Sequence, residues 1–196
     1  MKTNLIIKRL FDLLASLSGL IIMSPFMLAL SFVIKFTSPG PVLFKQERLG
    51  QYGQSFYIFK FRTMIENAEK MGAGLVVNNQ QDQRITKIGR MLRSTSLDEL
   101  PQLFNVIIGD MSLIGPRPPA IYHPYAGYSS YPEWAKKRFT MKPGMTGLTQ
   151  ITVRNAVSWD ERLKIDNQYI DEFSLKQDLV ILAKTFHRVI KPNTIY

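Results

Sequence analysis

The feature that most constrains this chain is an uncharged apolar run from Leu13 to Ile34, near the N-terminus. A helix needs about 20 such residues to cross the hydrocarbon core of a bilayer, so the run is long enough. A secretory signal peptide has a shorter apolar core that ends in small residues at a cleavage site, whereas this run continues through bulky residues such as Phe26 and Phe32. The run therefore predicts a helix inserted in a membrane.

Two details of the run argue against a straight span. Ser24-Pro25 lies near its middle, and an internal proline removes a backbone hydrogen bond and kinks a helix. Basic residues flank both ends of the run: Lys2, Lys8 and Arg9 before it, and Lys35, Lys45 and Arg48 after it. Because positive charge marks the cytoplasmic side, a re-entrant helix that turns at Ser24-Pro25 keeps both clusters inside. The alternative is an ordinary membrane span with a proline kink. In a re-entrant helix, the backbone groups freed at the bend would need hydrogen-bond partners, from Ser24 or from a neighbouring helix.

The charge and composition of the chain limit its partners. A formal net charge of +10 and a pI of about 9.8 point to nucleic acid, anionic lipid or phosphorylated substrates. The absence of cysteine excludes disulfides and thiol metal sites, and His123 and His187 lack the spacing of paired ligands. The length, 196 residues, suits one domain. We expect a membrane segment at residues 1–37 and a catalytic domain at residues 38–196.

The sequence pattern of residues 38–196 predicts an α+β fold. Strands near residues 42–44 and 55–61, joined by a turn at 48–53, form a hairpin. Residues 85–92 have helical spacing, and a helix near Asp98 continues to Ile108. The aromatic-rich loop of residues 121–134 lies either at a membrane interface or on its own core. Near the C-terminus, apolar residues at helical spacing alternate with Lys176, Lys184 and Arg188. This amphipathic helix either lies on an anionic membrane surface or packs on the core.

Asp98 and Glu99 are adjacent acids at a predicted helix start. Ser96 and Glu99 have the spacing of a capping box, and Pro101 allows a start one turn later. The free N–H groups of a helix N-terminus favour anions, so an ionised aspartate and a phosphate can lie side by side there. This arrangement suits attack by a carboxylate on a phosphoryl group. The alternative is that the two acids only stabilise the helix.

Two basic turns follow the acidic pair. In Gly109–Pro118, Arg117 stands between two prolines, and a rigidly presented guanidinium suits bidentate recognition of phosphate. A second tight turn runs from Lys142 to Gln150. Together with the acidic pair, these turns indicate a site for phosphorylated substrates.

In order and spacing, these motifs resemble the bacterial sugar transferases, the monotopic phosphoglycosyl transferases, and in particular their small members that consist of the catalytic domain alone. The resemblance covers nearly the whole chain. It rests on the segments Lys8-Arg9 to Asp12, Ser24-Pro25, Lys60 to Met64, Arg93 to Asn105, Gly109 to Pro118, Lys142 to Gln150, Arg154-Asn155 with Trp159, and Asp178. Thr149 and Ile151 depart slightly from the family pattern, and the Tyr122–Trp134 loop matches none of it, so the resemblance implies no particular sugar.

The resemblance implies transfer of a sugar 1-phosphate from a UDP-sugar to a polyprenol phosphate, usually undecaprenyl phosphate, with release of UMP at the start of glycoconjugate biosynthesis. Asp98 would be the nucleophile and form an acyl phosphate, and Glu99 would act as a base or orient Asp98 and the metal. Mg²⁺ is implied, held partly by Asp98 and the diphosphate. The family also implies a re-entrant helix broken at Ser24-Pro25, interfacial amphipathic helices, and a monotopic position on the cytoplasmic face of the bacterial inner membrane. Downstream glycosyltransferases would be further partners.

The resemblance also assigns substrate ligands. Phosphate ligands are expected, in this order, at Arg93, Arg117, Lys60 and Arg62. Each of these cations has the alternative of a solvated charge or an ion pair. The nucleotide or sugar would be bound by Gln150, Arg154 and Asn155, whereas Asp178 would support an arginine or the metal, or simply begin a helix.

The sequence features bear on three alternative functions. A membrane-associated nucleic-acid binder would use the positive charge but not Asp98 and Glu99, and no nucleic-acid motif is recognisable, so we expect no such partner. A non-catalytic scaffold of a glycan-assembly pathway would not need an intact acidic pair. A transferase that spans the membrane many times would need several apolar segments, whereas this sequence has one.

Overall fold

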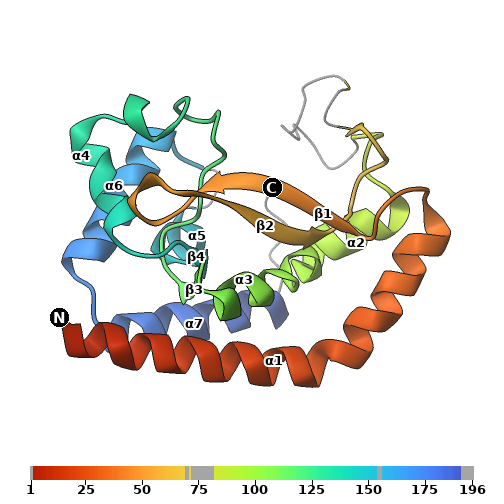
Figure 1. Ribbon diagram of the computed structural model, residues 1–196, viewed down its shortest axis with the longest axis horizontal. Helices are drawn as coiled ribbons and strands as arrows, with labels where there is room; N and C mark the ends of the chain where they lie inside the picture. The colour runs from red at the N-terminus through yellow and green to blue at the C-terminus, as the bar shows by residue number, and fades with distance from the viewer. Residues whose placement is uncertain (1, 69–70, 72–81, 154–155, 191–196) are drawn as a thin grey trace.

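The computed structural model describes residues 2–68, 71, 82–153 and 156–190. Its described part combines helices with two small sheets, as the predicted α+β class requires (Figure 1). Helix α1 (Lys2–Thr37) runs along one side of the molecule beneath α3 (Gln102–Ile108) and α7 (Leu175–Ile190). It is the one described helix that is long and apolar enough to cross a membrane.

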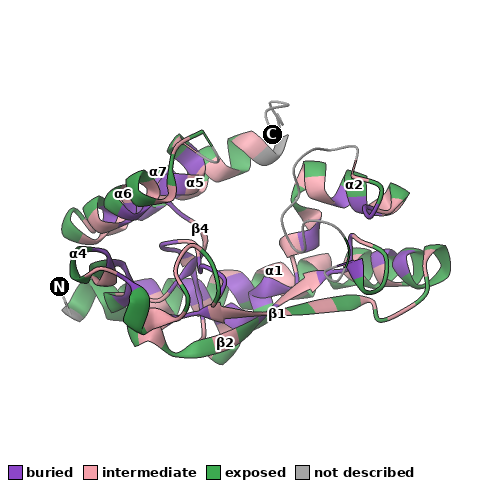
Figure 2. Cartoon of the chain, turned by 90° about the horizontal axis from the view of Figure 1, so that it is seen from above, coloured by how far each residue is buried: buried purple, intermediate pink, exposed green. Residues whose placement is uncertain are grey.

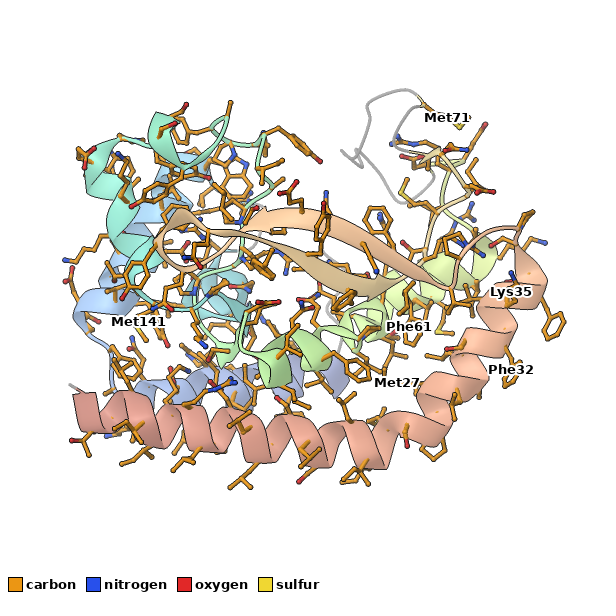
Figure 3. The ribbon with its side chains drawn as sticks, in the orientation of Figure 1. Met27, Phe32, Lys35, Phe61, Met71 and Met141 are labelled. Carbon is orange, nitrogen blue, oxygen red and sulfur yellow. The ribbon has the colours of Figure 1, made fainter. Side chains whose placement is uncertain are left out.

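Helix α1 bends near its middle. The bend precedes the segment that carries Met27 and Lys35, which rises away from the first part of the helix (Figure 3). Pro25 has no N–H to donate to the carbonyl of Ile21, and the Ser24 hydroxyl donates to that carbonyl instead, at 2.9 Å. The predicted kink at Ser24-Pro25 is thus confirmed, with Ser24 as the partner of the freed carbonyl.

The first part of α1 is polar on its covered face and apolar on its exposed face. Lys8, Asp12 and Ser16, four residues apart, are all buried, while apolar side chains on the other faces are exposed (Figure 2). Both charged side chains on the covered face have partners: Lys8 Nζ lies 2.7 Å from Asp178 Oδ2, and the Asp12 carboxylate accepts hydrogen bonds from the Ser112 hydroxyl and the Leu113 N–H. A soluble helix buries its apolar face, so this reversed pattern is what a helix at a membrane requires.

The predicted hairpin is confirmed. Strands β1 (Leu43–Leu49) and β2 (Ser55–Phe61) pair antiparallel, with Leu43 opposite Phe61 and Leu49 opposite Ser55. The first strand is longer than predicted. A second sheet pairs β3 (Ser112–Ile114) parallel to β4 (Gly144–Thr146).

The remaining helices flank these sheets. In chain order they are η1 (Gln51–Gly53, between β1 and β2), α2 (Lys87–Thr95), η3 (Leu97–Glu99), η4 (Tyr128–Ser130), α4 (Glu133–Lys136), η5 (Lys137–Thr140), α5 (Leu148–Thr152) and α6 (Trp159–Asp171). The aromatic loop before α4 packs on its own core, one of the two predicted outcomes: Tyr131 is buried with Leu49 and Phe139, and Tyr125 and Tyr128 pack against them. Helix α7 covers Ile181 but leaves apolar residues exposed, namely Leu179, Val180 and Phe186.

Candidate active site

The acidic pair lies in the short connection between α2 and α3. Helix α2 ends at Thr95, and its C-cap residue Ser96 has left-handed backbone geometry (φ 58°). The 3₁₀ turn η3 then carries Asp98 and Glu99. The predicted capping box is wrong, because the Ser96 side chain caps no helix. The alternative helix start, one turn later, is confirmed, because α3 begins directly after Pro101. Proline is tolerated at a helix start because it has no N–H that needs a partner.

Glu99 is held by two cations. Its Oε1 accepts a bond from Lys60 Nζ at 2.6 Å and another from Arg117 Nη2 at 2.8 Å. Burial alone would raise the pKa of Glu99, but the charges of Arg117 and Lys60 outweigh burial and hold the pKa well below its ordinary value. Glu99 is therefore ionised throughout the physiological range and fixes both cations.

Asp98 has the opposite environment. It is buried, 8% exposed, and no described residue donates a hydrogen bond to its carboxylate. Burial raises the pKa of Asp98 to about 6; the charge of Lys60 opposes this rise, the charge of Glu99 adds to it, and Arg93 and Arg117 oppose it more weakly. The carboxylate is thus ionised at neutral pH, with lone pairs free to attack or to bind a cation.

Arg93 is the third cation beside Asp98 among the described residues. Its Nε donates to the Thr63 hydroxyl at 2.9 Å, which leaves the outer guanidinium nitrogens for a ligand. Helix α2 can approach Thr63 this closely because residue 89 is glycine: a Cβ there would lie 2.0 Å from the Thr63 carbonyl oxygen. Thr63 stands in a motif noted in the sequence, but nothing there indicated its contact with Arg93.

Lys60 is placed by a side chain that sequence reasoning missed. The fully buried Asn105 donates from Nδ2 to the Tyr57 carbonyl at 2.7 Å and accepts the Phe59 N–H at 3.0 Å. One amide therefore extends the hydrogen bonding of β2 and fixes that strand to α3, which follows the acidic pair. An asparagine inside the apolar stretch from Leu103 to Ile108 was the available signal.

Two predicted ligands lie elsewhere. The Arg62 Nη2 donates to Ser38 and to the Ile34 carbonyl, so this guanidinium closes the C-terminal end of α1. The Asp178 carboxylate accepts bonds from Lys8 Nζ and from the Tyr169 hydroxyl, both at 2.7 Å. Arg62 is not among the cations that act on Asp98, and these contacts join Arg62 and Asp178 to α1 and α6; their roles as substrate ligands stay predictions.

Gln150 lies in α5, where its Nε2 bonds weakly to the Met145 carbonyl at 3.4 Å and its Oε1 is buried without a partner in the described part of the chain. Arg154 and Asn155 lie outside the described residues.

The donor set fits a magnesium ion that is shared with substrate. Among the described residues, no three acidic or histidine side chains gather into a metal site. Mg²⁺ does not need such a cage, because it keeps several waters and often takes one or two carboxylates together with substrate phosphates. Asp98, whose oxygens receive no hydrogen bond from the described part of the chain, can supply such a carboxylate, whereas Glu99 is occupied by Lys60 and Arg117.

The described residues thus bring together a buried carboxylate that receives no hydrogen bond from them and three cations, an arrangement that suits phosphorylated ligands. The bacterial sugar transferase family model matches residues 3–192. This chain therefore belongs to the bacterial sugar transferase family.

Its relatives differ in length. The chain is 42% identical, over 95% of its length, to the uncharacterized sugar transferase EpsL of Bacillus subtilis, and covers 88% of that protein. It is 41% identical, over 96% of its length, to the galactosyl transferase CpsE of Streptococcus agalactiae. It is also 41% identical, over 93% of its length, to the UDP-glucose:undecaprenyl-phosphate glucose-1-phosphate transferase of Klebsiella pneumoniae. The chain spans less than half the length of the last two proteins, 43% and 40%.

Proposed function

We propose that this chain transfers a sugar 1-phosphate from a UDP-sugar to undecaprenyl phosphate and releases UMP. The observation that carries this proposal is the buried Asp98 carboxylate, which receives no hydrogen bond from a described residue and lies beside Lys60, Arg93 and Arg117. A carboxylate with free lone pairs is a nucleophile, and neighbouring cations bind phosphate. The name of the Klebsiella relative supports a UDP-sugar donor and an undecaprenyl phosphate acceptor.

In the first step an Asp98 oxygen attacks the phosphorus atom that bears the sugar. The bond between this phosphorus and the bridging oxygen breaks, UMP leaves with the bonding electron pair, and an acyl phosphate that carries the sugar remains on Asp98. Arg93 and Arg117 bind phosphate oxygens and offset their charge, as a preorganised positive site does for a transition state. A Mg²⁺ ion, bound by Asp98 and the donor diphosphate, would supply further charge neutralisation.

In the second step a phosphate oxygen of undecaprenyl phosphate attacks the same phosphorus. Asp98 leaves as a carboxylate, and the product is the undecaprenyl diphosphate sugar. Glu99 keeps Lys60 and Arg117 in place through both steps, and its contacts support an orienting role. Because the enzyme carries a covalent intermediate between two substrates, we expect ping-pong kinetics.

The lipid substrate requires the site to lie at a membrane. We propose that residues 1–37 form a re-entrant helix, that residues 38–196 form the catalytic domain on the cytoplasmic face, and that α3 and α7 touch the interface through exposed residues such as Phe104, Ile108 and Phe186. The chain contains no cysteine, so single cysteines at Thr3 and Lys45 can be labelled selectively. Both should react only from the cytoplasmic side; a cysteine at position 45 that reacts from the opposite side would instead show a span.

A UMP-release assay tests the transfer. Purified protein, undecaprenyl phosphate and Mg²⁺ are incubated with a panel of UDP-sugars, and Asp98→Asn should release no UMP. With UDP-sugar alone, mass spectrometry should find a phosphosugar adduct on Asp98. If the wild-type protein released no UMP with any UDP-sugar, the proposal would fail and a scaffold role would be favoured.

A further inference from the structure

The segment that carries Arg117 is held by its carbonyl groups. Pro116, Pro118 and Pro119 have no N–H, so this segment can donate few backbone hydrogen bonds to the rest of the fold. Instead, all four successive carbonyls of residues 116–119 accept hydrogen bonds from other parts of the fold. In chain order the donors are Gly144 N at 3.0 Å, Arg138 Nη2 at 2.6 Å, Arg48 Nη1 at 3.0 Å and Leu49 N at 3.0 Å.

Arg138, which binds the carbonyl of Arg117 itself, belongs to a buried network. It is 3% exposed, and its Nε and Nη2 lie 3.0 and 2.7 Å from Asp166 Oδ2. The other oxygen of Asp166 accepts a bond from the Thr149 hydroxyl. Asp166 lies in α6 and Thr149 in α5, so two helices fix the orientation of one guanidinium.

Stability alone does not account for this ion pair. Replacing a buried ion pair by well-packed apolar residues is often neutral or stabilising, because desolvation offsets the attraction between the charges. An apolar pair, however, cannot donate to a carbonyl. The Arg138 fork bonds to Asp166 and to the Arg117 carbonyl together, which a planar guanidinium can do and a smaller cation cannot.

The Arg117 side chain depends on this backbone support. It is 43% exposed, and its described side-chain contact is the bond from Nη2 to Glu99. The side chain is therefore partly exposed, and the position of its guanidinium depends on where its backbone lies.

We propose that Arg138, oriented by Asp166, is a positioning residue that fixes the Arg117 backbone and so keeps the Arg117 guanidinium beside Glu99 and the substrate phosphates. Arg48 supports the next carbonyl in the same way. The inference rests on the proposed transfer reaction, because the role it assigns to Arg138 is exerted through a phosphate ligand of that reaction. Arg138 itself touches neither Asp98 nor Glu99 by any described contact.

Arg138→Lys separates the two contacts of this side chain. Lysine keeps a positive charge for Asp166 but lacks the fork that reaches the carbonyl as well. Misplacement of a catalytic group by about 1 Å can cost about 100-fold, so we expect kcat/KM for UMP release to fall about 10- to 100-fold. Binding of UDP, measured by calorimetry in detergent, should weaken in parallel. Arg138→Met should unfold at a lower temperature than Arg138→Lys.

A double-mutant cycle shows whether Arg138 acts through Arg117. In an Arg117→Ala background, Arg138→Lys should change kcat/KM and UDP binding by less than about twofold, because the group it positions is gone. If the Arg138 variants do not fold, Arg48→Gln removes the donor to the Pro118 carbonyl and leaves the buried Arg138–Asp166 pair intact. The fall in kcat/KM that it causes should likewise be suppressed in the Arg117→Ala background. Lys8→Met is the matched control, since it breaks a buried ion pair whose described contacts do not include Arg117; its effect should be equal in both backgrounds.

Equal losses for Arg138→Lys, or for Arg48→Gln, in both backgrounds would overturn the inference while leaving the proposed function intact. No loss in the wild-type background would overturn it equally. A wild-type protein that neither binds UDP nor releases UMP would refute the proposed function itself.

Discussion

Replacing Asp98 by asparagine should abolish transfer and, at the same time, stabilise the folded protein. Burial raises the pKa of Asp98 from an ordinary value of 3.8 to about 6. At about 1.4 kcal/mol per pKa unit, the ionised carboxylate costs roughly 3 kcal/mol of folding free energy above pH 6. Asparagine has nearly the shape of the protonated acid and carries no charge, so it removes that cost.

The pH dependence of this gain follows from linkage. Asp98 loses its proton near pH 3.8 in the unfolded chain and near pH 6 in the folded protein. The wild-type protein therefore loses stability as the pH rises from about 4 to 6, and the deficit is constant at higher pH. Asp98→Asn should gain less than about 1 kcal/mol at pH 4 and roughly 3 kcal/mol at pH 8.

Thermal unfolding in detergent at both pH values measures this gain. For a chain of this length 1 kcal/mol corresponds to about 2–4 °C, so the melting temperature should rise by roughly 6–12 °C at pH 8. Glu99→Gln is the matched control of opposite sign: the amide oxygen can still accept a hydrogen bond, but the negative charge that pairs with Lys60 and Arg117 is lost, so the protein should be destabilised at pH 8 by at least about 1 kcal/mol. The reasoning is refuted if Asp98→Asn melts at or below the wild-type temperature at pH 8, or if both variants shift it in the same direction.

Two other predictions concern contacts away from the acidic pair. Thr63→Val removes the acceptor of Arg93 Nε and should lower kcat/KM for UMP release about tenfold, equivalent to about 1.4 kcal/mol. Thr63→Ser keeps the hydroxyl and should retain the wild-type kcat/KM, and a valine variant with full activity would contradict this role. Asp178→Asn leaves Lys8 buried without a counter-charge and should lower the free energy of unfolding by roughly 3 kcal/mol with little change in KM for the UDP-sugar, whereas a large rise in KM would return Asp178 to the substrate site.

The features that sequence predicted well are those with local causes. Pro25 lacks an N–H in any context, so the kink and the need of the Ile21 carbonyl for a new partner could be foreseen. The hairpin follows from two short β-rich runs around a turn, and the start of α3 from a proline at position 101. None of these depends on a distant residue.

The features that sequence missed depend on contacts between distant segments. Glu99 has the spacing of a capping box, but it bonds instead to Lys60 of β2 and to Arg117 of the turn after β3. Two charge-assisted hydrogen bonds stabilise a buried carboxylate more than a single capping bond does. Lys60 and Arg62 are two residues apart and both cationic, yet Lys60 reaches Glu99, while Arg62 lies past the end of β2 and reaches Ser38. Sequence spacing carries no information about which of the two has an acid within reach.

The contrast between the two adjacent acids explains how one short turn can hold a reactive carboxylate among cations without neutralising it. Successive side chains leave a 3₁₀ turn about 120° apart, so Asp98 and Glu99 cannot present their oxygens to the same donors. Lys60 and Arg117 donate their hydrogen bonds to Glu99. Asp98 interacts with the same two cations through their charge, and it accepts no hydrogen bond from them. If these donors bonded to Asp98 instead, its lone pairs would be engaged and its basicity would fall. In the proposed reaction, these opposite environments would divide the work: Glu99 would anchor the cations, and Asp98 would stay basic enough to attack phosphorus.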